Sequence, residues 1–316
     1  MIPAGFDYLR PATVAEALEL ASVNENARYL AGGHALLPER KLRRAGPSTL
    51  IDLGRIAELR RIEVLEDRAL PQPDGSGGSG GPGRVVRIGA MTTSAEIEYS
   101  PDIARYTPLL AEAAAVISDP LIRNRATLGG SLAEADPHGD WPPVVLAAGA
   151  TVHLRSRDDE RAVPAGEFFT ANSDGHGTGS TALRPGELLT AVAVPAAGAR
   201  TRSTYLKRMH PASGHAMIGV AVAAAFDAGD TCRECRIAIT GTATIATRAV
   251  RAEDRLIGAR LTPDTIEAAA DAASNGIAFT GDAFGSATYL AELLPVYVSR
   301  ALSRIASGEH QEMKSG

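Results

Sequence analysis

The chain has 316 residues, 45% of them hydrophobic, and its 32 Lys plus Arg against 37 Asp plus Glu give a formal net charge of −5. This composition predicts a globular protein of two or three domains, and the acidic balance argues against nucleic-acid binding. No apolar run approaches the roughly 20 residues of a membrane-spanning helix, and the N-terminus lacks a signal-peptide pattern. We therefore expect a cytoplasmic protein without direct membrane insertion.

The first 57 residues predict a small α/β lobe. Thr13 and Glu16 form a capping-box pattern at the start of a helix that continues to about residue 21. A short apolar strand at 27–31 leads into a glycine loop, a helix through 39–43 and a second strand at 49–53. Two strands joined by a helix favour a parallel pair.

A larger lobe is predicted from residue 58 to 197. A hairpin pairs 61–66 with 85–89, and the Gly/Ser/Pro-rich segment 71–83 between them reads as a surface insertion. Helices are expected from about residue 91, at 108–117 and at 141–148, and strands at 150–155 and 188–195. The spacing Gly175-x-Gly177-x-Gly179 follows no convincing strand, so we interpret it as a plain loop.

The remainder, 198–307, has a different pattern and precedes a tail at 308–316. Strands at 203–209, 218–227 and 235–243 follow one another by short turns, which predicts an antiparallel sheet. Helices at 263–275 and 286–306 would cover one face of it. We place the boundary between the two parts near residues 195–200.

The chain contains two cysteines, Cys232 and Cys235. A zinc or iron–sulfur site normally needs four ligands, and the sequence offers no second pair. The histidines show no metal-ligand spacing, and the sequence contains no Gly-x-Ser-x-Gly elbow of a hydrolase. We therefore expect no metal site, and we interpret the cysteines as ordinary residues of the turn that begins at Asp227.

Two glycine-rich stretches are the candidate functional elements. Ala31-Gly32-Gly33-His34 follows the first strand, and Thr127-Leu128-Gly129-Gly130-Ser131 lies about a hundred residues on. Backbone N–H groups bared by glycine bind an anion such as a dinucleotide pyrophosphate, whereas most Gly-Gly pairs are only turns. Neither stretch has the G-x-G-x-x-G spacing of a Rossmann fold. The spacing alone does not distinguish a pyrophosphate-binding loop from an ordinary glycine turn.

The order of motifs along the chain resembles the FAD-binding medium subunit of molybdenum hydroxylases, the group of aerobic carbon monoxide dehydrogenase and xanthine dehydrogenase. The resemblance covers about residues 1 to 305. It rests on Phe6-Asp7-Tyr8, Ala31 to Pro38, Ile88 to Thr93, Asp119-Pro120, Arg123-Asn124, Thr127 to Ser131, Asp136-Pro137, Leu183 to Leu189, Tyr205-x-Lys207 and Arg300-Ala301-Leu302. It implies an α+β protein. A two-lobed FAD-binding domain of the p-cresol methylhydroxylase (PCMH) type would precede a smaller C-terminal domain with a three-stranded antiparallel sheet and helices.

The resemblance also implies the residues that hold FAD, without a covalent link. The two glycine loops would hold the pyrophosphate, Asp140 (or its neighbour Asp136) would contact the flavin nucleotide, and Leu189 and Lys207 would lie near the flavin. Two departures are Ala35, where the family commonly has serine, and Ser131, where it has Asn or Asp. The full candidate set is Leu30, Ala31, Gly32, Gly33, His34, Ala35, Leu36, Ile117, Thr127, Gly129, Gly130, Ser131, Asp136, Asp140, Leu189 and Lys207.

Two of these residues keep alternative interpretations. His34 is either a polar group near FAD or a residue that fixes its own loop through a backbone hydrogen bond. Lys207 is either the cation that stabilises reduced flavin at its N1–C2 edge or a surface lysine. No residue of this chain is assigned a catalytic role toward a substrate.

By this resemblance the chain is the electron-transfer subunit of an oxidoreductase. A molybdopterin-binding large subunit and a small subunit with [2Fe–2S] clusters would complete the complex, as a dimer of heterotrimers. Electrons would pass from the clusters through FAD to an external acceptor. The alternatives are a stand-alone FAD-dependent oxidoreductase and a scaffold subunit that has lost FAD. The substrate and the acceptor lie outside what this chain encodes.

Overall fold

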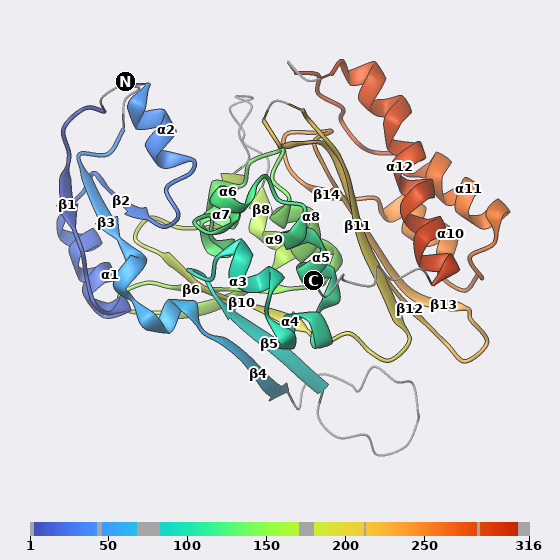
Figure 1. Ribbon diagram of the computed structural model, residues 1–316, viewed down its shortest axis with the longest axis horizontal. Helices are drawn as coiled ribbons and strands as arrows, with labels where there is room; N and C mark the ends of the chain where they lie inside the picture. Colours follow the sequence, from blue (N-terminus) through green and yellow to red (C-terminus); the bar gives the residue numbers. More distant parts are fainter. Residues whose placement is uncertain are drawn as a thin grey trace.

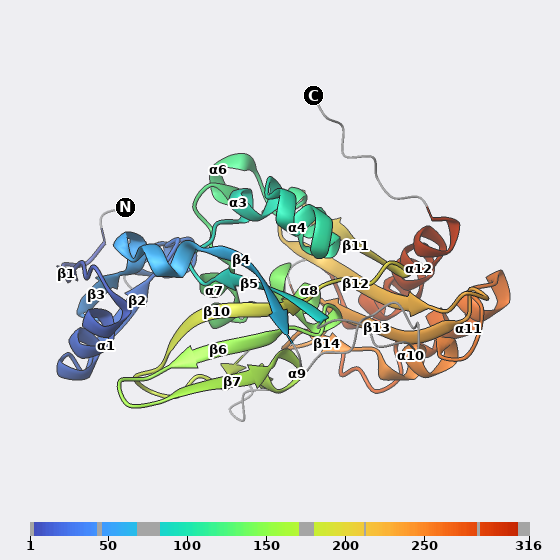
Figure 2. The same cartoon turned by 90° about the horizontal axis from the view of Figure 1, so that it is seen from below.

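The computed structural model describes residues 3–42, 46–67, 83–170, 180–211, 213–282 and 285–308. The predicted insertion at 71–83 (apart from Gly83), the Gly175–Gly179 loop and nearly all of the 308–316 tail fall outside these residues. The described residues form three larger sheets in succession along the long axis of the molecule, with helices between and beside them, and one two-stranded sheet (Figures 1 and 2). No helix among the described residues is long and apolar enough to cross a membrane.

The first sheet is the parallel one predicted for the N-terminal lobe. Its order is β1 (Asp7–Leu9), β3 (Thr49–Asp52), β2 (Ala27–Leu30), and both pairings are parallel. Helix α1 (Val14–Val23) is capped by Thr13, and α2 (Leu36–Lys41) follows the first glycine loop. Two 3-10 helices, η1 (Leu53–Arg55) and η2 (Ala57–Arg60), lead out of the lobe. Strand β1 was not predicted, because three residues are too short for a hydrophobic period.

The second sheet is antiparallel and has the order β4-β5-β10-β6-β7. Its strands are β4 (Ile62–Asp67), β5 (Gly83–Gly89), β10 (Leu188–Pro195), β6 (Thr151–Arg155) and β7 (Glu160–Pro164). The predicted hairpin is confirmed, with Ile62 opposite Ile88. A two-stranded sheet pairs β8 (Phe169–Thr170) with β9 (Ser180–Thr181).

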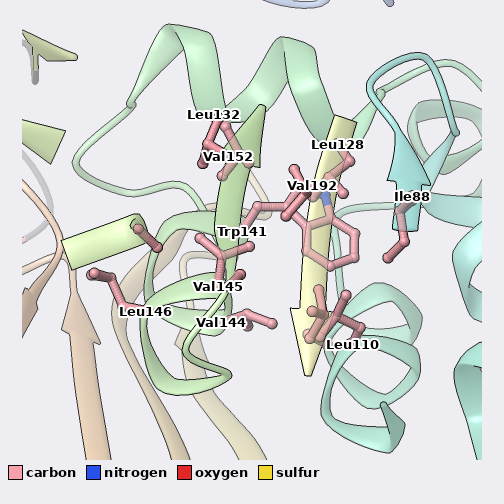
Figure 3. Close-up of a cluster of buried hydrophobic side chains, with 14 of the residues drawn as sticks. Ile88, Leu110, Leu128, Leu132, Trp141, Val144, Val145, Leu146, Val152 and Val192 are labelled. Atoms are coloured by element: carbon pink, nitrogen blue, oxygen red, sulfur yellow. The ribbon is translucent and has the colours of Figure 1, made fainter. Parts of the chain in front are cut away.

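Helices pack on this second sheet around a buried tryptophan. They are α3 (Ser94–Glu98), α4 (Pro101–Tyr106), α5 (Pro108–Ala115), α6 (Pro120–Arg123), α7 (Leu128–Glu134), α8 (Trp141–Ala147) and α9 (Ala165–Phe168). Trp141, 2% exposed, lies among Ile88, Leu110, Leu128 and Val192 (Figure 3). Helix α8 begins with Pro142 and Pro143 in its first turn, as predicted, and every one of its residues is buried.

The third sheet is buried on both faces. Strands β11 (Thr201–Met209), β12 (Ala216–Phe226) and β13 (Cys232–Thr240) are antiparallel, which confirms the three predicted strands, and β14 (Thr247–Arg248) adds a short edge. Helices α10 (Val250–Leu256), α11 (Pro263–Ala272) and α12 (Ala287–Ser307) cover one face (Figure 1). Helices α5 and α8 contact the other. Burial on both faces explains why β12 reads as a continuous apolar run.

One sequence-based interpretation is wrong in this region. Cys232 and Cys235 do not belong to a turn, because both lie in β13 and both are buried. The turn itself is present at 227–231, where Asp227 N–H donates to Thr231 O.

Candidate functional site

The first glycine loop lies at the carboxyl edge of the parallel sheet. It leaves β2 after Leu30, and Gly33 has a φ of +78°, a conformation that disfavours side chains. Among the described residues, the N–H groups of Gly32, Gly33, His34 and Ala35 have no hydrogen-bond acceptor. Adjacent N–H groups without acceptors are what the predicted anion nest requires, and the binding of an anion there stays a prediction.

The second glycine stretch differs from the prediction, because it is the first turn of α7 and its N–H groups are already engaged. Leu128 N donates to Thr92 O, Gly129 N to Ala90 O, and Ser131 N to Thr127 O. Gly130 N donates to Oγ1 of Thr127, the residue that caps the helix. The N–H groups of 128–131 are therefore not available to a ligand, but the glycines of this segment leave space for another segment to pack closely against it.

The two glycine segments are brought together in space, and the absence of Cβ atoms makes this possible. A Cβ on Gly32 would lie 2.3 Å from Arg125 O, and one on Gly130 would lie 3.1 Å from the Cβ of Ala31. A Cβ added to Gly129 would lie 2.5 Å from the Cβ of Ala90. Gly32 and Gly130 thus allow the contact between the two segments independently of a ligand, whereas Gly33 approaches only side chains of Leu30 and Leu37 and Gly129 approaches Ala90.

A cleft of about 580 Å³ opens between these segments. Its walls include Ala31 and Gly32 from one side and Arg125 and Thr127 from the other. The carboxyl ends of β1 and β3 contribute as well, through Arg10, Asp52 and Gly54. Ligands of open α/β sheets bind at the carboxyl ends of strands, so the position of the cleft fits a ligand site.

His34 contacts its own loop, and the residues that follow it lead into α2. The Nδ1 atom of His34 lies 3.0 Å from Gly32 O within the same loop, which is the loop-fixing contact. Ala35 is the N-cap of α2 and makes no side-chain capping bond, so the hydroxyl that the family commonly has there is missing. Leu36 begins α2.

A second cluster gathers Asp140, Lys207 and a residue that sequence reasoning did not include in the site, Tyr205. Tyr205 OH donates to Asp140 Oδ1 at 2.6 Å, and Lys207 Nζ donates to Asp140 Oδ2 at 3.0 Å and to Gly214 O at 3.1 Å. Gly219 makes room for the phenol, since a Cβ there would be 2.4 Å from the Tyr205 hydroxyl. Tyr205 belongs to the Tyr-x-Lys motif, and this motif is the sequence feature that could have identified it as a site residue.

Burial sets the electrostatics of this cluster. The side chain of Lys207 is 4% exposed and that of Asp140 is 8% exposed. Burial raises the pKa of Asp140, whereas the charge of Lys207 and the hydrogen bonds from Tyr205 and Lys207 act to lower it. Burial, together with the neighbouring carboxylate, raises the pKa of Tyr205 well above its usual value. Lys207 is therefore not a surface lysine, and Asp140 balances its charge.

The other predicted residues lie around the same cluster or connect it to the glycine segments. Asp136 accepts from His138 N and lies 3.7 Å from His215 Nδ1. Ile117 is 8% exposed and precedes Ser118, which Gly214 approaches closely. Leu189 is buried in the core cluster that contains Leu128. No group of three or more metal-ligating side chains occurs among the described residues.

The residues present therefore fit an extended dinucleotide: unpaired N–H donors for a pyrophosphate, a cradle that a Cβ would fill, and a polar cluster farther along. The fold is the one expected for a PCMH-type domain followed by a smaller α+β domain, and the cleft and the N–H groups without acceptors suit a nucleotide ligand. A family model described as "FAD binding domain in molybdopterin dehydrogenase" matches residues 4–70 and 79–197, and one described as "CO dehydrogenase flavoprotein C-terminal domain" matches 203–305.

Relatives of known activity match along their whole length. The chain is 37% identical to the carbon monoxide dehydrogenase medium chain of Hydrogenophaga pseudoflava, covering 96% of this chain and 98% of the relative. It is 33% identical to the nicotine 6-hydroxylase medium subunit of Paenarthrobacter nicotinovorans, with 93% and 95% coverage. A solved structure of carbon monoxide dehydrogenase from H. pseudoflava that lacks the Mo-pyranopterin moiety superimposes with a TM-score of 0.85 at 38% identity, covering 97% and 99% of the two chains.

The chain belongs to the family of FAD-binding medium subunits of molybdenum hydroxylases. Members of this family are subunits of oxidoreductases, and FAD is the cofactor of the domain that spans most of this chain. The resemblance that the sequence motifs indicated is confirmed.

Proposed function

We propose that this subunit relays electrons from [2Fe–2S] clusters of a partner subunit through FAD to an external acceptor. A molybdopterin-binding large subunit and a small iron–sulfur subunit would complete the complex, as a dimer of heterotrimers. The observation that carries the proposal is the row of N–H groups without acceptors at Gly32–Ala35, which begins where Gly32 packs against Arg125 O, in a chain similar to a medium subunit over 96% of its length.

FAD, when bound, accepts and releases electrons, and the residues of this chain bind and orient it. We assign the pyrophosphate to the N–H groups of the first loop, which need no cationic side chain for this task. Thr127 and Ser131 would add hydroxyls, and the Gly129–Gly130 pair would allow close approach. The binding is proposed to be non-covalent, since His34 is engaged with its own loop.

The Asp140–Lys207–Tyr205 cluster is proposed to position the far part of the same ligand. The ammonium of Lys207 would favour negative charge that develops on reduced flavin, but its effect is moderated by the paired carboxylate. Asp140 is preferred over Asp136 as the ligand-facing acid because Asp140 is the more buried of the two and is held by two donors.

We further propose that the chain divides near residue 197, with lobes at about 1–57 and 58–197 and a second domain at 198–307. The separate parallel sheet, the five-stranded sheet and the four-stranded sheet support this division. The cytoplasmic location expected from the sequence stays a prediction.

The test is purification of the chain with its neighbouring subunits, followed by reduction with substrate under anaerobic conditions. Flavin absorbance should bleach only when the iron–sulfur subunit is present, and acid denaturation should release FAD into the filtrate. A chain that oxidises a substrate by itself would favour the stand-alone oxidoreductase, and a complex devoid of flavin would favour the scaffold. Flavin that stays attached after denaturation would contradict non-covalent binding.

A further inference from the structure

The two cysteines of the chain lie on one face of β13 because of a bulge. Two residues three apart on a regular strand point to opposite faces. Here Cys232 pairs with Phe226 and Cys235 pairs with Ala224, and the register shifts by one residue between them. Phe226 and Ala224 are two apart on β12 and share a face, so the cysteines do as well. The intervening Arg233 and Glu234 are both exposed.

The two thiols are close neighbours inside the layer between the sheet and its helices. Cys232 is 0% exposed and Cys235 is 3% exposed, and both are in the core cluster that includes Ala252 and Leu256 of α10. Both lie on the same face of β13, and the Sγ of Cys232 also lies 3.3 Å from the backbone oxygen of Glu234, to which it donates. Because their partners Phe226 and Ala224 are two residues apart on β12, the Cα atoms of the two cysteines are separated by roughly 6.6 Å, at the upper end of the range of about 4.4–6.8 Å that a disulfide spans.

We propose that Cys232 and Cys235 are a redox-active dithiol that a low-molecular-weight disulfide oxidises to an intrachain disulfide. This modification site is separate from the flavin site in sequence and in the fold. The pairing depends on the bulge, because the same Cys-x-x-Cys spacing on an unbroken strand would keep the sulfurs apart.

The chemistry is thiol–disulfide exchange in two steps. The Cys232 thiolate attacks one sulfur of the reagent, forms a mixed disulfide and releases the first thiol. The Cys235 thiolate then attacks the Cys232 sulfur and releases the second thiol. The protein loses two electrons and two protons in total, and the reagent gains both.

The local structure assigns the order of the two residues. Cys232 is the first residue of β13, next to the 227–231 turn, so fraying of the strand end is sufficient to expose it. The interaction with the neighbouring Cys235 thiol lowers the pKa of Cys232, whereas the interaction with Cys232 and burial raise the pKa of Cys235. Cys232 is thus the attacking thiol and Cys235 the resolving one.

The experiment is thiol counting on the folded full-length chain, with its partners and cofactor if they copurify. The protein is treated with oxidised glutathione, quenched with acid, and then unfolded in urea and alkylated with iodoacetamide at about pH 8, where free thiols react as thiolates, before its mass is measured by mass spectrometry. The chain has only two cysteines, so the readout is unambiguous. We expect a species with no alkyl group and two hydrogens fewer than the reduced chain. Dithiothreitol should restore two alkylation sites.

Three other results would overturn the proposal. These are two alkylated cysteines after treatment, a stable glutathione adduct on the wild-type chain, or oxidation only after unfolding in urea. The order of attack is tested by single substitutions. Cys235→Ser should accumulate a glutathione adduct at Cys232, whereas Cys232→Ser should remain largely unmodified. The reverse pattern would make Cys235 the attacking residue and contradict the assigned order.

Discussion

Lys207 Nζ lies 3.0 Å from Asp140 Oδ2, and both side chains are almost completely removed from solvent. A buried ion pair costs desolvation on both sides, so removing one partner leaves the other charge uncompensated. This pair joins the segment before α8 to β11, and so it connects the second sheet to the third.

We expect the substitutions Asp140→Asn and Lys207→Met each to lower the free energy of unfolding by about 3 kcal/mol, the usual penalty for an unpaired buried charge. The double variant should be less destabilised than the sum of the two, because no unpaired charge remains in it. Urea denaturation of the four proteins measures this coupling. Additive effects would show that the pair contributes no coupling energy.

The same variants test the proposed role in flavin binding. If the ammonium acts on reduced flavin, Lys207→Met should lower the flavin midpoint potential in the purified complex. A potential and an electron-transfer rate that both remain at wild-type values would remove Lys207 from the proposed function and leave it a structural role only.

The approach of Gly32 to Arg125 gives the second prediction. An added Cβ would lie 2.3 Å from the Arg125 carbonyl oxygen, so Gly32→Ala must push the first loop away from the start of α7. Because the proposed pyrophosphate site is made by this contact, we expect the purified variant to retain less FAD. The ratio of flavin to protein absorbance measures this.

Gly166→Ala is the matched control for that experiment. Gly166 lies in α9, and nothing lies within 4 Å of an added Cβ. Alanine is favoured over glycine in a helix by up to about 1 kcal/mol, so this variant should keep its FAD and its stability. Equal flavin retention in the two variants would contradict the assigned role of the first loop.

The sequence predicted the long elements well, since their periodicity is strong. It treated the start of α7 as a loop, and it missed other short elements, which are stabilised by tertiary contacts instead of local propensity: β1, α4, α6, β7, α9, β8, β9, β14 and α10. The sequence predicted that the two glycine segments lie close together, and Gly130 does approach Ala31, but it could not show whether the N–H groups of each segment are engaged. Whether Gly129 N–H is engaged depends on Ala90, 39 residues away, and no local pattern encodes that contact. The Tyr205–Asp140 hydrogen bond was missed for the same reason.

A third prediction concerns Glu253, which anchors α10 to β13. Its carboxylate is 2% exposed and accepts from Ile237 N and from Arg248. Glu253→Ala leaves a buried N–H and a guanidinium unpaired, and we expect a loss of about 3 kcal/mol in the free energy of unfolding. Glu253→Gln keeps an acceptor for Ile237 N and should lose less. Thermal unfolding distinguishes the two, and equal losses would argue that the ion pair with Arg248 dominates.

The last prediction is a pH dependence carried by Glu187. Its carboxylate receives two hydrogen bonds from Arg161, at 2.7 and 2.8 Å, and one from Arg184 N, at 2.8 Å. The hydrogen bonds from Arg161 are the main cause that holds the pKa of Glu187 below its ordinary value of 4.5. A lowered folded-state pKa means that the unfolded chain binds the proton first as the pH falls. The stabilisation is therefore present at neutral pH and is lost as the pH falls from 4.5 through the folded-state pKa.

We expect Glu187→Gln to lower the free energy of unfolding by about 1 kcal/mol at pH 7, because it removes a charge-assisted bidentate contact at the edge of a sheet. The difference between wild type and variant should shrink as the pH is lowered below 4.5. Glu160→Gln is the control, because Glu160 is 69% exposed in its pair with Arg155, and such pairs contribute little. Denaturant titrations at a series of pH values give the curves. A Glu187→Gln difference that stays constant with pH would show that the loss arises from packing and not from the carboxylate charge.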